Sequence, residues 1–98
     1  MVKIRVKGYL RFKGLVGDEA ILELETEKAT LRDALNALCR QRGERLESVL
    51  LDPSTKEIRR SNLVLLNGQT HISLRSRLDT ELKDGDEIAL CPVLAGGQ

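Results

Sequence analysis

Apolar and polar residues alternate at the start of the chain, with the period of a β-strand that buries one face. The apolar positions of this run are Val2, Ile4 and Val6. The polar positions between them are Lys3, Arg5 and Lys7. A second alternating run covers residues 20–25, and residues 15–18 between the runs have the composition of a turn. The pattern therefore predicts a β-hairpin over residues 2–25 with a long connecting loop.

A helical period begins after Thr30. Apolar residues then recur at helical intervals: Leu31, Ala34, Leu35, Leu38 and Cys39. Thr30 and Asp33 have the spacing of a capping box, so they predict the start of this helix, and Gly43 predicts its end. A shorter helical turn is expected around residues 46–50, because three apolar residues lie there on one side and Pro53 follows.

The next segment is polar and then briefly apolar. Residues 52–62 are rich in turn formers and predict a surface loop. Residues 63–66 form an apolar run that predicts a strand, and the pair Asn67-Gly68 predicts the turn that ends it. Residues 69–73 can return as a short edge strand.

The last part of the chain predicts one more strand and completes the fold class. Residues 78–82 are expected to pack a 3₁₀ turn under the sheet through two leucines. Residues 87–94 predict a strand in which Pro92 weakens regular pairing, because proline has no N–H to donate. One amphipathic helix cannot bury its apolar face alone, so the element order predicts an α+β fold, a mixed sheet of four to five strands packed on one main helix.

Composition limits the chain to one domain and argues against several classes of function. The 98 residues are 41% apolar and 32% charged, enough for one modest core. The net charge is +1 and the aromatic residues are only Tyr9 and Phe12, so we expect no nucleic acid or membrane as partner. No apolar run approaches the length of a membrane span and no signal peptide is recognised, so the expected location is the cytoplasm.

Cysteine and histidine offer little chemistry. Cys39 lies on the apolar face of the helix and Cys91 in the apolar last strand, so both are predicted to be buried structural thiols. His71 is expected to be a solvent-facing strand residue. No bound cofactor or metal is predicted, and the phosphate-binding and nucleophile motifs of common enzymes do not occur. We therefore do not expect an enzyme that acts alone.

Charge is unevenly distributed along the chain. Residues 1–15 carry five basic groups and no acid, whereas residues 78–98 carry five acids and one lysine. These excesses face each other if the first and last strands are neighbours. A separate basic set is expected to be a solvated face, with an acidic partner surface or RNA as alternatives; it consists of Lys56, Arg59, Arg60, Arg75 and Arg77.

Several features of the C-terminal half occur together. They are the sequence Leu66-Asn67-Gly68, the run of residues 78–90 with its turn at residues 83–87, Pro92, and Ala95-Gly96-Gly97 near the end. In combination they resemble the MoaD/ThiS sulfur carriers, which share the β-grasp fold of ubiquitin. The resemblance implies a β-grasp domain over residues 1–94 and a flexible diglycine tail over residues 95–98. The chain departs from the family at Gln98, which follows the second glycine, and at Cys91, where an aromatic residue is common.

The resemblance implies that the reacting group is the carboxylate of Gly97. In the family, an E1-like adenylating enzyme activates this carboxylate with MgATP, and a sulfur donor such as a cysteine desulfurase or a rhodanese supplies the sulfur of a thiocarboxylate. Gly96 and Gly97 lack Cβ atoms, so they would fit a narrow channel in the partner. Gln98 would first have to be removed by a protease.

The acceptor of the sulfur and the docking surface are further expectations. Sequences of this kind most often serve molybdopterin, as the small subunit of molybdopterin synthase beside its large subunit. Thiamine thiazole, thiolated tRNA, amino-acid synthesis, conjugation to lysines as a ubiquitin-like modifier, and an interaction module with an inert tail remain alternatives. Alternation and position next to the tail predict the residues that dock the partners: Leu63, Leu65, Val93, Leu94 and Ala95.

Overall fold

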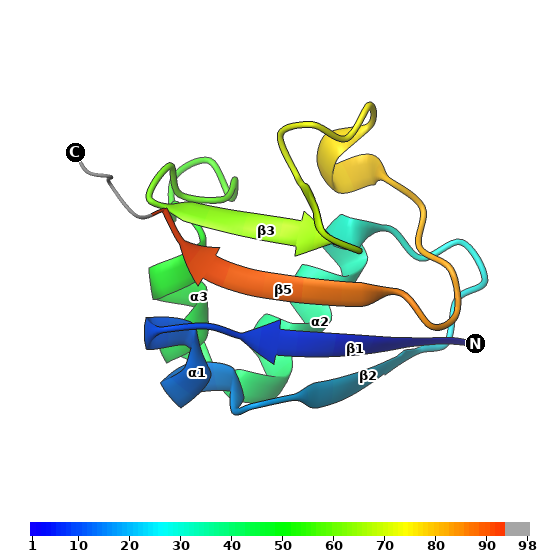
Figure 1. Cartoon of the computed structure of the whole chain (residues 1–98), viewed down its shortest axis with the longest axis horizontal. Coiled ribbons are helices and arrows are strands. Elements are labelled where there is room, and N and C mark those ends of the chain that lie inside the picture. The colour runs from blue at the N-terminus through cyan, green and yellow to red at the C-terminus, as the bar shows by residue number, and fades with distance from the viewer. Residues whose placement is uncertain (94–98) are drawn as a thin grey trace.

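The computed structural model describes residues 1–93 and shows a mixed sheet of five strands with the main helix packed across one face (Figure 1). The strands are β1 (Val2–Gly8), β2 (Ala20–Leu24), β3 (Asn62–Leu66), β4 (Gln69–Thr70) and β5 (Glu87–Pro92). Their order in the sheet is β2-β1-β5-β3-β4, with β5 parallel to β1 and antiparallel to β3. The last strand therefore lies in the middle of the sheet, and the predicted α+β class is confirmed.

The main helix has the predicted boundaries. Helix α2 (Leu31–Arg42) begins with a capping box, in which the Asp33 N–H donates to Thr30 Oγ1 at 3.2 Å and the Thr30 N–H donates to Asp33 Oδ2 at 3.0 Å. It ends at Gly43, whose φ of 96° favours glycine. The shorter helix α3 (Glu44–Leu50) follows, and the 3₁₀ helix η1 (Arg77–Asp79) precedes β5. Within residues 1–93 none of the helices has the length and apolar character to cross a lipid bilayer.

The connection between β1 and β2 differs from the prediction. The two strands pair antiparallel from Val2 opposite Leu24, as the hairpin required. The connection, however, contains helix α1 (Arg11–Val16) rather than a simple loop and turn. Phe12 and Val16 are buried on one side of this helix, so packing against the sheet stabilises a helix too short to form alone.

Gly8 permits the close approach of α1 to the end of β1. A Cβ atom at Gly8 would lie 2.5 Å from the carbonyl oxygen of Phe12. We expect Gly8→Ala to lower the free energy of unfolding by about 2 kcal/mol, because the backbone of the helix would have to move. Chemical denaturation measures this loss, and Gly14→Ala in the same helix is the control, since its Cβ would meet nothing within 4 Å. Equal stability of the two variants would contradict the packing argument.

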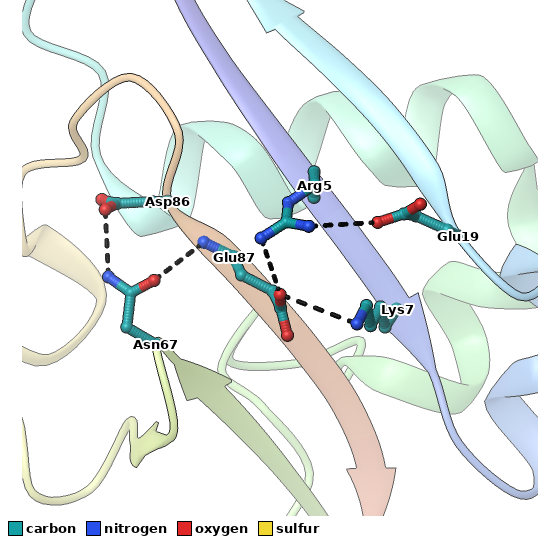
Figure 2. A network of polar contacts seen from close by, with 6 residues as sticks. All are labelled: Arg5, Lys7, Glu19, Asn67, Asp86 and Glu87. Carbon is teal, nitrogen blue, oxygen red and sulfur yellow. Dashed lines mark hydrogen bonds and ion pairs between the residues drawn. The ribbon is translucent and has the colours of Figure 1, made fainter.

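Strand β3 ends in the predicted two-residue turn. Asn67 and Gly68 have φ values of 52° and 87°, as a tight hairpin turn requires. The Asn67 amide also binds the neighbouring strand, donating to Asp86 Oδ1 at 3.0 Å and accepting from the Glu87 N–H at 3.0 Å (Figure 2). The return strand β4 is two residues long, shorter than the expected 69–73.

The two faces of the sheet differ in character. Inward-facing strand residues and the helices form one core, whose largest fully buried members include Ile4, Val6, Phe12, Leu31, Leu38, Leu46, Leu50, Val64, Ile88 and Leu90. No helix covers the outer face in the described part of the chain (Figure 1). Strand β5 ends at Pro92, two residues earlier than predicted. Residues 94–98, which include the predicted tail, lie outside the described residues.

Candidate functional site

The candidate site is the place where the chain leaves the sheet towards Gly96 and Gly97. Pro92 lies opposite Asn62 in the ladder between β5 and β3. The Val93 N–H then donates to the carbonyl of Ser61 at 2.7 Å, and this is the last described contact of the backbone. The end of this central strand is therefore fixed by hydrogen bonds up to Val93.

The buried side chain of Asn62 fixes the backbone next to this exit point. It is the one polar residue among the buried residues of the described chain, with 2% of its surface exposed. Its Nδ2 donates to the carbonyls of Val49 and Leu50 at 2.8 and 3.2 Å, and its Oδ1 accepts from the Arg11 guanidinium. One side chain thus ties the start of β3 to α3 and α1. This role of Asn62 was not predicted from the sequence, although Asn62 extends the inward alternation of Val64 and so carries a signal for burial.

An apolar strip on the outer face of the sheet leads to the exit point. Leu63 lies opposite Cys91, and Leu65 lies opposite Ala89 in the β3–β5 ladder. These four residues are half-buried, and Val93 is 42% exposed. The predicted outward orientation of Leu63, Leu65 and Val93 is confirmed, whereas Leu94 and Ala95 lie outside the described residues. The role of all five residues in docking stays a prediction.

Charged residues of β1 and β5 border the apolar strip. Glu87 pairs with Arg5 at 3.1 Å and with Lys7 at 3.7 Å, and Arg5 also reaches Glu19 at 3.8 Å (Figure 2). The predicted opposition of a basic first strand and an acidic last segment is therefore confirmed. These pairs are partly exposed, so each contributes little stability. Their main effect is to balance the charge on the outer face of the sheet next to the apolar strip.

The two cysteines are both free thiols but differ in position. Cys39 is buried as predicted, and burial together with the nearby Glu47 charge raises its pKa to about 11. Cys91 is only half-buried and lies on the outer face, so its predicted burial is wrong. Burial still raises the pKa of the Cys91 thiol. Neither side chain is an activated nucleophile.

His71 is not the solvent-facing strand residue that the sequence suggested. It follows the end of β4 and is half-buried, and its Nδ1 accepts a hydrogen bond from the Val64 N–H at 3.2 Å. Burial lowers the pKa of the imidazole; the hydrogen bond with the Val64 backbone opposes this shift, and the charge of Arg77 adds to it. Through Nδ1 the imidazole serves as an acceptor at the edge of β3. Within residues 1–93, no three His, Cys, Asp or Glu side chains gather as a metal site.

Comparisons with known proteins agree on the class of protein. A family model described as the ThiS family matches residues 11–97. A candidate sulfur carrier protein of Archaeoglobus fulgidus is 30% identical over 76 residues, which are 78% of this chain and 83% of the relative.

Solved structures agree on the fold. The small archaeal modifier protein 1 of Methanosarcina acetivorans is 27% identical, with a TM-score of 0.81 over 99% of this chain and 98% of that chain. A candidate molybdopterin converting factor, subunit 1, of Pyrococcus furiosus is 28% identical, with a TM-score of 0.73 over 96% of this chain and all of that chain. These similarities confirm the predicted ubiquitin-like β-grasp fold. The chain therefore belongs to the ThiS family of small ubiquitin-like carrier and modifier proteins.

Proposed function

We propose that this protein carries sulfur as a thiocarboxylate on Gly97. The observation that supports the proposal is the exit point: the central strand β5 ends at Pro92, shortly before Gly96 and Gly97 in the sequence, and an outward-facing apolar strip lies beside this end. A partner can hold the body by this strip while the tail enters its active site. From Pro92 to Gly97 the extended chain spans at most about 20 Å, enough to reach a buried catalytic centre.

The chemistry requires two partner enzymes. A carboxylate is a poor electrophile, so an E1-like adenylating enzyme first joins Gly97 to the α-phosphate of ATP and releases pyrophosphate. A persulfide on a cysteine desulfurase or a rhodanese then attacks the acyl carbon, AMP leaves, and an acyl disulfide forms. A thiol cleaves its S–S bond and leaves the thiocarboxylate. The carrier contributes the acyl group and the docking surface, and the catalytic groups belong to the partners.

This chemistry requires a free carboxylate on Gly97. Gln98 follows Gly97 in the sequence, and its side chain is larger than a channel shaped for glycine admits. We propose that a protease cleaves after Gly97. The expected acceptor of the sulfur is molybdopterin, with this protein as the small subunit of molybdopterin synthase. The similarity to the converting-factor subunit of Pyrococcus furiosus supports this choice.

Conjugation to proteins is the second candidate function. It is supported by the similarity to the small archaeal modifier protein 1 of Methanosarcina acetivorans over nearly the whole of both chains. A modifier shares the adenylation step, and the final nucleophile is a lysine amine instead of sulfur. The two functions can be separated by what is attached at Gly97.

Intact mass spectrometry of the protein purified from its own cells tests the proposal. We expect a population that has lost Gln98 and carries the mass change of an oxygen-to-sulfur exchange at Gly97. A variant that lacks both Gly96 and Gly97 is the control and should show no such exchange. Thiocarboxylate on chains that still end in Gln98 would refute the processing step. Lysine conjugates without thiocarboxylate would favour the modifier function.

A further inference from the structure

A groove lies beside the outer edge of β3, close to the exit point, and shares Leu63 and Val93 with the apolar strip. One wall is formed by residues 57–60 of the loop before β3, and the other by His71 and Ile72, which follow β4, together with Arg77 and Leu78 of η1. In Figure 1 the first of these loops lies above the start of β3 and the second lies above its end. The groove has a volume of about 410 Å³, within the range of ligand sites.

The floor of the groove is apolar and accessible. Leu63 and Val93 line it from the sheet, and Ile72 lines it from the second wall with 56% of its surface exposed. The imidazole of His71 also lines the groove. Because Nδ1 accepts from the Val64 N–H, the proton of the neutral ring lies on Nε2, which remains available as a donor. An apolar side chain can therefore be buried here next to a polar contact.

The two walls carry cations that the described chain does not neutralise. Arg60 on one wall and Arg77 on the other are exposed, and neither forms an ion pair within residues 1–93. The one acid that lines the groove, Glu57, is already paired with Arg32 at 3.8 Å. Arg59 also lines the groove, but its Nε donates to a backbone carbonyl of α3.

The structure thus divides the basic set that the sequence grouped together. Arg59, Arg60 and Arg77 line this groove, whereas Lys56 pairs with Glu47 at 3.5 Å and belongs to another surface. Arg75 is exposed but does not line the groove. Three of the five basic residues therefore lie around the apolar floor of one groove, so the set does not form a single basic face.

We propose that this groove binds an extended acidic segment of a partner protein, with an apolar side chain on the floor and carboxylates on the two walls. Complementary charge favours a protein segment, since Arg60 and Arg77 both line the groove beside its apolar floor. The composition of the groove argues against RNA, because neither Tyr9 nor Phe12 lines it for base stacking. A segment bound here would lie beside Val93 and hold the body at the start of the tail.

Nuclear magnetic resonance titration tests the proposal independently of any sulfur chemistry. The probe is the capped peptide Gly-Glu-Leu-Glu-Gly, added to the isotope-labelled full chain. We expect shifts concentrated at the amides of Leu63, Ile72 and Val93. The double variant Arg60→Glu with Arg77→Glu should bind about ten-fold more weakly, a loss of about 1.4 kcal/mol for the two charge contacts together.

Two controls make the outcome decisive. The double variant Lys28→Glu with Arg45→Glu changes the net charge equally at exposed positions outside the groove, and should bind the peptide as the unmodified protein does. The peptide Gly-Lys-Leu-Lys-Gly should leave the groove amides unshifted. The proposal is overturned if no groove amide shifts up to the solubility limit of the acidic peptide, or if both double variants weaken binding equally. It is also overturned if a uridine oligonucleotide shifts these amides and the acidic peptide does not.

Discussion

Asn62→Leu is expected to lower the free energy of unfolding by about 3 kcal/mol. The leucine cannot donate to the carbonyls of Val49 and Leu50, and it cannot accept from Arg11, so a hydrogen bond to a charged group is lost and a buried carbonyl is left without its donor. For a domain of this size the loss corresponds to a fall in melting temperature of roughly 12 °C or more. Calorimetry and denaturant titration measure both quantities.

The control for this prediction is Asn36→Leu. Asn36 is an exposed residue of α2, so the same chemical change there should alter stability by less than about 0.5 kcal/mol. If Asn62→Leu were as stable as the control, the anchoring role of Asn62 would be wrong. If the loss occurred as expected, hydrogen exchange should also show faster opening at the N–H of Val93, because its acceptor Ser61 precedes Asn62 directly.

Leu65→Asp is expected to reduce adenylation of the tail about 50-fold, through a higher KM for the carrier. A carboxylate in the middle of the apolar strip would be desolvated by a docked partner, and central apolar contacts commonly contribute about 2 kcal/mol or more. Since the tail and its glycines are unchanged, kcat should remain close to that of the unmodified protein. Pyrophosphate exchange by the adenylating enzyme of the same cell, with a carrier that ends at Gly97, measures the two constants separately.

Ile21→Asp is the matched control for the docking surface. Ile21 lies on the outer face of β2, opposite Arg5 in the ladder and therefore on the far side of the charged pairs. Its exposed fraction of 48% makes the substitution tolerable for the fold. A KM that rises equally in both variants would mean that the partner covers the whole outer face, and a KM unchanged by Leu65→Asp would remove the apolar strip from the docking surface.

Much of the fold could be predicted because the local sequence signals and the packing of the folded chain favour the same helix and strand boundaries. The capping box of Thr30 and Asp33 marks the start of α2, and the turn at Asn67-Gly68 marks the end of β3. Period-two alternation placed Leu63 and Leu65 on the outer face. These features depend on neighbours in sequence, so one chain is enough to find them.

The missed features depend on residues that only the fold brings together. Helix α1 has a single pair of buried residues, Phe12 and Val16, and packing against the sheet supplies the stability that its sequence lacks. Cys91 was judged by the apolar character of its strand, although alternation with Leu90 places it outward. The groove needs two loops more than ten residues apart in sequence to flank β3, which no local pattern can reveal.

The central position of β5 also determines how the protein responds to mechanical force. A force on the C-terminus pulls β5 along its own axis. The hydrogen bonds to β1 and β3 are then loaded in shear and at the same time, instead of opening one after another. Forced unfolding is then governed by the barrier to sliding a whole strand out of the sheet. We therefore expect the folded body to resist a force applied at its C-terminus better than a force applied across the edge of the sheet.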